Sequence, residues 1–408
     1  MAPNGSEADD LRAGRRKAAR YVVPVTVVGV AAATIGLVPA LAASGDPDLP
    51  KISAQQLIEK IAQSDVQHLS GTVKVSTDLG LPNLGGLESG LASGAARGGD
   101  GSSADPASKL PELASGTHTL RVASDGEDRQ KVSLIESAAE YSLIHNGKDV
   151  WGYDSKSNEV FHSTAGDSAG KHRGEAPATP KNFADEALKS VDDTTSVKVD
   201  GTAQVAGRDA YRLVIEPKHA SGTTVGVISI AVDAKTGLPL KFTLTPASGG
   251  AAVLDAGFTR ISFAKPAAST FDFTPPKGAK ITEGKDADKA ARKDAGKDSG
   301  RKTGPGRPFH EPGTQEKGLA ENGPKVLGKG WNSIAVFDTG TKGGVPSSAG
   351  KGDLSGFLDS LGDQVSGTFG KGTVFSTRLV NALITDNGKV YVGAVTKDTL
   401  VKAANAGK

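Results

Sequence analysis

Asp338 lies in a sequence pattern that can present a catalytic carboxylate. Phe337-Asp338-Thr339-Gly340 follows a hydrophobic strand pattern, which is how an aspartic protease presents its catalytic aspartate. That chemistry needs two carboxylates that share one proton, and the sequence contains a single Asp-Thr-Gly. The related stretch at Asp233 has Ala and Lys inserted and cannot supply the second copy. A single-copy protease that dimerises is therefore a distant alternative, and the favoured prediction is a strand that ends in a turn.

Three further stretches resemble catalytic or ligand-binding motifs, but none matches its motif fully. Ser168 and Lys171 have the Ser-x-x-Lys spacing of acyl enzymes but lie in a Gly/Ser-rich loop. Lys371 sits in a phosphate-loop-like stretch, yet Gly follows it where Ser or Thr is required. His162 and His172 share one polar loop, without a helix or strand to aim them at one metal ion. We predict no enzymatic activity, no metal site and no cofactor.

Composition narrows the function further. The 408-residue chain has no cysteine, which excludes disulfides, zinc-thiolate sites and thiol catalysis. Its formal net charge is only +2, and it lacks the concentrated basic face that nucleic-acid binding requires. We therefore predict no nucleic-acid partner and two or three domains.

The N-terminus predicts export. Residues 1–20 end in a basic region, and residues 21–43 form an uncharged apolar run that closes with Ala-Leu-Ala, a spacing that signal peptidase accepts. The run is also long enough to remain as a single membrane anchor. We predict an extracytoplasmic protein, either secreted or held at the outer face of the cytoplasmic membrane, and leave cleavage open.

Residues 50–280 predict one large antiparallel sheet with two helices. Ser53 and Gln56 form a capping box at the start of the first helix, and Thr179 caps the second. Asn146-Gly147 is a hairpin signal among about ten predicted strands. Residues 80–115 show no hydrophobic periodicity, and we expect a flexible insertion there, with a mobile apolar flap as the alternative.

A charged, Gly- and Pro-rich linker is predicted at 281–325, followed by a small C-terminal α+β domain at 326–408. In that domain we expect a strand at 332–337, a short helix at 353–362 and a terminal helix capped by Thr396.

The large sheet carries apolar residues at alternate positions, and only two helices are predicted to cover its strands. This leaves room for a hydrophobic ligand, although plain packing against the helices is an equally good interpretation. The candidate cavity-lining residues are Trp151, Tyr153, Leu213, Ile215, Leu240, Phe242 and Leu244. A structural turn is predicted at Asp233, Gly237 and Pro239.

Several segments together resemble the LolA/RseB (MucB) superfamily of extracytoplasmic lipoprotein- and lipid-binding proteins. The resemblance covers about 50–282 and is carried, in this order, by residues 149–160, 205–218, 228–244 and 271–281. The last domain is similar to the smaller C-terminal domain of RseB/MucB proteins, through 330–337, 372–380 and 389–400. The Ala- and Gly-rich composition suggests an actinobacterial-type member.

The resemblance implies an α+β fold: a curved, unclosed antiparallel half-barrel with a helical lid, plus the small C-terminal domain. It implies binding without catalysis, with lipid or lipoprotein acyl chains held in a hydrophobic cavity. LolA-type members carry lipoproteins. RseB-type members bind a membrane anti-sigma factor, so an anti-sigma factor or another envelope protein is the alternative partner.

Overall fold

The computed structural model describes residues 46–80, 102–164, 179–284, 325–338 and 362–407. The predicted export segment and nearly all of the predicted linker lie outside the described residues, as does the helix expected at 353–362. The chain divides into two units after Asp46, and the elements below belong to the second unit.

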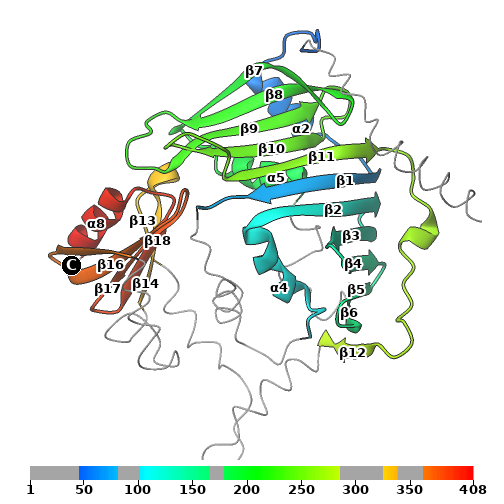
Figure 1. Cartoon of the computed structure of the whole chain (residues 1–408). Helices are drawn as coiled ribbons and strands as arrows, with labels where there is room; N and C mark the ends of the chain where they lie inside the picture. The colour runs from blue at the N-terminus through cyan, green and yellow to red at the C-terminus, as the bar shows by residue number, and fades with distance from the viewer. Residues whose placement is uncertain (1–45, 81–101, 165–178, 285–324, 339–361, 408) are drawn as a thin grey trace, which may run out of the picture. The chain divides into compact units, whose positions relative to one another are not determined.

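Twelve strands form one large sheet (Figure 1). Their order is β12-β6-β5-β4-β3-β2-β1-β11-β10-β9-β8-β7, and the sheet is not closed into a barrel. The strands are β1 (His68–Thr77), β2 (Gly116–Asp125), β3 (Arg129–Ile135), β4 (Glu140–Asn146), β5 (Asp149–Asp154), β6 (Glu159–Thr164), β7 (Thr195–Val205), β8 (Arg208–Pro217), β9 (Val225–Asp233), β10 (Pro239–Pro246), β11 (Leu254–Ser262) and β12 (Lys280–Glu283).

The edge strand β12 departs from the predicted antiparallel pattern. It pairs with β6 in parallel, whereas the other paired neighbours in this sheet are antiparallel. A parallel pair needs a long connection. The chain from β6 to β12 supplies it, since it includes α5, strands β7 to β11 and the short 3-10 helix η2 (Ala268–Thr270).

Helices α2 (Ala54–Ala62) and α5 (Pro180–Lys189) begin where their capping residues predict. The Ser53 side chain accepts a hydrogen bond from the Gln56 backbone, and the Gln56 side chain accepts one from the Ser53 backbone. Thr179 caps α5, with Pro180 in its first turn. Both helices pack their apolar sides on strands β8 to β10, in a cluster that includes Leu57 and Phe242.

One face of the large sheet is apolar from β8 to β4. Residues paired across neighbouring antiparallel strands share a face, and the registers connect Leu213, Ile230, Phe242, Ala256 and Val75 on one side. On the neighbouring strands the same face carries Val73, Leu120, Leu134 and Tyr141. We call this side the helix face, because α2 and α5 pack on it.

Residues 102–114 do not form a featureless insertion. They contain the four-residue helix α4 (Pro106–Lys109) and the 3-10 helix η1 (Leu110–Ala114), and Leu113 packs against the core of the helix face. We call residues 102–114 the cover segment. The rest of the predicted insertion, 81–101, lies outside the described residues.

Six strands form a second, smaller sheet in the order β13-β14-β18-β17-β16-β15. They are β13 (Lys325–Leu327), β14 (Ile334–Asp338), β15 (Asp363–Gly367), β16 (Gly370–Ser376), β17 (Asn381–Thr385) and β18 (Lys389–Gly393), with η3 (Gly330–Asn332) before β14 and α8 (Lys397–Ala406) at the end. Thr396 caps α8, as its sequence predicts.

The smaller sheet is apolar on both faces. Helix α8 packs on the face that carries Ile334, Leu383 and Tyr391. The registers place Val326 and Phe337 on the opposite face, where their side chains are exposed. Their half-buried apolar neighbours on that face are Ala335, Phe375, Ala382, Ile384, Val390 and Val392.

Candidate functional site

Five of the seven predicted lining residues lie together on the helix face. Leu213, Ile215, Leu240 and Phe242 are buried, and Leu244 is half-buried. The Phe242 ring lies 5.5 Å from that of Phe183 on α5, measured between ring centroids. In the described structure these side chains therefore contact helices, so a ligand would reach them only if part of that covering moved.

Trp151 and Tyr153 lie on the opposite face of the sheet, away from the other five candidate lining residues. Gly152, which lies between them in β5, is on the helix face, because it pairs with Leu143 and Leu143 packs in the helix-face core. Alternate residues of a strand point to opposite sides, so Trp151 and Tyr153 point away from α2 and α5. Both rings instead contact Phe273, each with 5.6 Å between centroids.

His162 fastens the edge strand β12. It lies in β6, not in a loop, and its Nδ1 is 2.9 Å from Glu283 of β12 while its Nε2 is 3.0 Å from Asp149. The ring stacks on Trp151 at 3.9 Å between centroids. Burial opposes charging of the imidazole, but the hydrogen bonds to Asp149 and Glu283 outweigh it and raise the pKa of His162 above 6.5.

The raised pKa predicts a pH-dependent contribution to stability. A group with a raised folded-state pKa stabilises fully below its unfolded pKa, here about 6.5, and loses that contribution as pH rises through the folded value. Both carboxylates are half-exposed, so we expect His162→Gln to cost under about 1 kcal/mol at pH 6. Urea unfolding at pH 6 and pH 9, with exposed His219→Gln as control, measures this. Equal costs at both pH values would contradict the prediction.

Asp233, Gly237 and Pro239 form the turn between β9 and β10. Asp233 is 1% exposed and accepts hydrogen bonds from both Arg208 Nε (2.5 Å) and a second guanidinium nitrogen (3.1 Å). It also accepts from the backbone of Lys235 and Thr236. Burial alone would raise the pKa of Asp233, but the hydrogen bonds from Arg208 and Thr236 hold it below its ordinary value.

The cover segment is fastened to β5 and β6 by polar contacts. Glu159 accepts hydrogen bonds from the Ser103 backbone (2.8 Å) and from the hydroxyls of Ser102 (3.0 Å) and Ser103 (2.9 Å). The Ser103 backbone N–H and the Lys280 ammonium are the main causes that lower the pKa of Glu159 to about 2. Glu159 is therefore ionised at neutral pH, and it anchors the start of the cover segment.

Lys109 forms the second polar attachment. Its ammonium lies 3.1 Å from Asp154 and 3.5 Å from Glu136, and it stands over the Tyr141 ring at 5.6 Å from the centroid. Its side chain is 13% exposed and that of Asp154 is 7% exposed. The two charges therefore depend on each other for stabilisation.

Gly152 makes room for the cover segment. A Cβ at this position would stand 2.2 Å from the Ala104 carbonyl oxygen, so a larger residue would displace that carbonyl. The Tyr141 hydroxyl donates a hydrogen bond to the same oxygen at 3.2 Å. Ala104 itself is completely buried.

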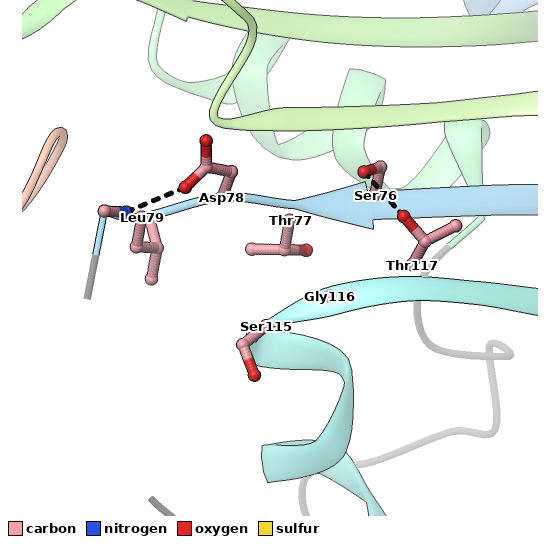
Figure 2. A pocket seen from close by; sticks show the side chains of 8 residues that line it. Ser76, Thr77, Asp78, Leu79, Ser115, Gly116 and Thr117 are labelled. Carbon is pink, nitrogen blue, oxygen red and sulfur yellow. Dashed lines mark hydrogen bonds between the residues drawn. The ribbon is translucent and has the colours of Figure 1, made fainter. Parts of the chain in front are cut away.

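A pocket of about 360 Å³ adjoins the end of the cover segment (Figure 2). It lies between the end of β1 and the start of β2 and is lined by Ser76–Gly80 and Ser115–Thr117. The Ser76 and Thr117 hydroxyls are 3.0 Å apart, and Asp78 accepts a hydrogen bond from the Gly80 backbone at 3.0 Å. Its lining residues are Ser, Thr, Asp, Gly and a single Leu, none of them among the predicted lining residues, so the pocket does not match the predicted acyl-chain cavity.

The structure adds no geometric support for the other candidate catalytic and metal-binding residues. Asp338 is exposed at the end of β14, while Thr339, Gly340, Ser168, Lys171 and His172 lie outside the described residues. Among the residues that the structure describes, no group of three His, Asp or Glu side chains could hold a metal ion. Within the same residues, no helix is long and apolar enough to cross a membrane.

Little in the sequence indicates the cover segment. Pro106 opens α4, and proline in a first helical turn is a recognised start signal. Lys109, Tyr141 and Glu159 carry no motif, because their roles depend on contacts between segments that are distant in the sequence.

The sequence matches no family model and no curated protein. Among solved structures, the chain is similar to MucB in the MucA/MucB complex of Pseudomonas aeruginosa, with 14% identity and a TM-score of 0.36, over 86% of this chain and 96% of that chain. A LolA superfamily protein of Nitrosomonas europaea has 10% identity and a TM-score of 0.22, over 55% and 99%. An outer membrane lipoprotein-sorting domain of Vibrio parahaemolyticus has 13% identity and a TM-score of 0.21, over 54% and 96%.

Proposed function

We propose that this chain is an exported, non-enzymatic protein that binds lipid or lipoprotein acyl chains on the helix face of its large sheet. It acts as a carrier or as an envelope-stress sensor. The observation that carries the proposal is the continuous apolar helix face, from Leu213 on β8 to Tyr141 on β4. Short elements cover this face: α2, α5 and the cover segment.

The helix face suits an acyl chain because burial of apolar surface drives binding without requiring directed polar groups. The proposed lining keeps Leu213, Ile215, Leu240, Phe242 and Leu244. Trp151 and Tyr153 are left out because they lie on the other side of the sheet.

A titration tests the proposed binding. Delipidated full-length protein is mixed with a fluorescent long-chain fatty acid, and the emission is followed. We expect saturable uptake that an unlabelled fatty acid displaces. Emission that rises without saturation, or no uptake at all, would contradict acyl-chain binding.

A second candidate function rests on the smaller sheet. Its face opposite α8 exposes Val326 (62%) and Phe337 (43%) among half-buried apolar neighbours. Exposed apolar patches mark protein-interaction sites. We propose as the alternative a regulatory module that binds an envelope protein through this face, such as a membrane anti-sigma factor.

Co-purification separates the alternative from the leading proposal. The full chain and its Phe337→Asp variant are used to capture membrane proteins from the source organism, with exposed Lys402→Glu on α8 as the matched control. A partner retained by the wild type and the control, but lost with Phe337→Asp, is the expected result. Equal retention by all three proteins would count against this face.

A further inference from the structure

We propose that the large sheet docks on the surface of an anionic lipid bilayer through a basic patch on the side opposite the helix face. We call this side the outer face, and the basic patch consists of Lys74, Arg121, Lys131 and Arg260. The inference goes beyond acyl-chain binding, because the basic patch and the helix face lie on opposite sides of the sheet.

The four cations lie on the four middle strands of the twelve, β3, β2, β1 and β11 (Figure 1). On β1, β2 and β3, each cation adjoins a residue of the helix-face core in the sequence. Alternate residues of a strand point to opposite sides, so these three cations are on the outer face. Arg260 pairs with Thr72, which lies two residues before Lys74 and shares its face.

Strand pairing brings the charges close together. Thr72 pairs with Arg121 on one side and with Arg260 on the other. The two arginines are therefore about 10 Å apart across the sheet, which is twice the strand spacing. Lys74 lies two residues further along β1, and Lys131 pairs with the residue two positions beyond Arg121 on β2. No run of basic residues predicts the patch, because its members come from four strands.

The cations of the basic patch have no counter-charge of their own. Among the residues that the structure describes, none of the four forms an ion pair. Lys74, Arg121 and Arg260 are exposed, and Lys131 is half-buried. On β7, β8 and β10, by contrast, the outer-face cations are paired: Lys198 with Glu216 (3.0 Å), Arg212 with Asp200 (3.4 Å) and Lys241 with Asp255 (3.0 Å).

The charges of the basic patch also act on Glu140, on β4. Burial opposes the ionisation of Glu140, but hydrogen bonds from Ser133 and Ser142, together with the charges of Lys131 and Arg121, lower its pKa below the ordinary value. One half-buried carboxylate does not balance four cations. Like charges on neighbouring strands repel each other, and an anionic surface would supply the missing counter-charges.

The side chains between the cations favour a lipid surface over a folded protein as the occupant. They are short: Thr72, Thr119, Ala123 and Gly257. Hydroxyl groups can donate hydrogen bonds to phosphate oxygens. A stable protein interface needs a centre rich in aromatic and apolar side chains, which these positions lack. A membrane surface needs only separate cations, each of which strengthens binding by about fivefold.

Sedimentation with lipid vesicles tests the docking. Full-length protein is mixed with vesicles of phosphatidylglycerol and phosphatidylcholine, or of phosphatidylcholine alone. We expect stronger binding to the anionic vesicles at about 0.1 M salt and loss of this preference at about 1 M, because salt screens exposed charges. The predicted apolar run at 21–43 is present in every sample, so the preference between the two compositions is the readout. Equal binding to both compositions would overturn the proposal.

Two double variants with the same change in net charge provide the matched comparison. Arg121→Gln with Arg260→Gln should weaken binding to anionic vesicles about 25-fold, which is about fivefold for each charge. Lys198→Gln with Arg212→Gln removes two paired cations of the same face. It should change binding less than about threefold, because β7 and β8 lie more than a Debye length of about 10 Å from the basic patch. Equal losses in the two variants would overturn the role of the patch.

A single charge reversal keeps the test decisive if a double variant fails to fold. Lys74→Glu, at an exposed position, should weaken binding to anionic vesicles at least about tenfold. Circular dichroism checks that each variant is folded. Binding to free inorganic phosphate or to an acidic protein, without a preference for anionic vesicles, would overturn the assignment to a membrane surface.

The vesicle experiment is independent of acyl-chain binding. We expect all these variants to take up the fluorescent fatty acid as the wild type does, because the basic patch is on the other side of the sheet from the helix face. If the wild type takes up no fatty acid, the proposed function fails, while the preference for anionic vesicles still decides the role of the basic patch.

Discussion

Asp233→Ala should lower the free energy of unfolding by about 3–5 kcal/mol, as expected when one partner of a buried ion pair is removed. Asp233 is 1% exposed and accepts two hydrogen bonds from Arg208. It also accepts two backbone hydrogen bonds within the β9–β10 turn. The substitution leaves the Arg208 charge without its partner and releases the turn. Urea-induced unfolding, followed by circular dichroism, measures the loss.

Asp255→Ala is the matched control for Asp233→Ala. Asp255 pairs with Lys241 at 3.0 Å, and both side chains are about two-fifths exposed. We expect a loss below about 1 kcal/mol, because solvent screens this pair. Similar losses in the two variants would show that the β9–β10 turn is not held by its buried carboxylate.

Phe242→Gln should abolish fatty-acid uptake. Phe242 is buried on the helix face beside Phe183 of α5, in the middle of the proposed lining. An amide placed there has no described partner for its hydrogen bonds, and a buried polar group without a partner disfavours apolar contact. Fluorescence titration of the folded variant measures uptake, and urea unfolding checks that the variant is folded at the assay temperature.

Trp151→Gln tests which face of the large sheet binds the ligand. Trp151 points away from α2 and α5 and packs on His162 and Phe273. Its loss should weaken the attachment of β12 but leave uptake within about twofold of the wild type, since surface changes away from a site have small effects. Loss of uptake in Trp151→Gln, together with normal uptake in Phe242→Gln, would show that the ligand binds on the face opposite α2 and α5, which would contradict the proposal.

The elements that depend on local chemistry could be predicted from sequence. The Ser53/Gln56 capping box and the caps at Thr179 and Thr396 begin helices in the structure as expected. Asn146-Gly147 joins β4 to β5, with Gly147 at φ +65°. Each of these signals needs only a few neighbouring residues, so the sequence carries all the information.

The features that sequence reasoning missed depend on contacts between distant segments. Alternation within β5 groups Trp151 with Tyr153, but only the register with β4 decides which face they occupy. The parallel pairing of β12 with β6 joins segments about 120 residues apart, fastened by His162 and Glu283. Residues 102–114 have no hydrophobic periodicity, and their docking depends on Glu159 and Gly152, which lie on other strands.

The proposed binding rests on the apolar helix face, because burial of apolar surface would supply the driving force for an acyl chain. Lys109 and Glu159 attach the cover segment to β5 and β6. A carrier that releases its cargo and a sensor that reports ligand would both require the same bound acyl chain.

Acyl-chain binding can be tested by mass spectrometry of the lipids that co-purify with the full-length protein from its own source. We expect a stoichiometric acyl-bearing molecule in the wild-type protein and in Trp151→Gln, and its loss in Phe242→Gln. Protein that carries no acyl-bearing molecule above the level found with Phe242→Gln would contradict acyl-chain binding on the helix face.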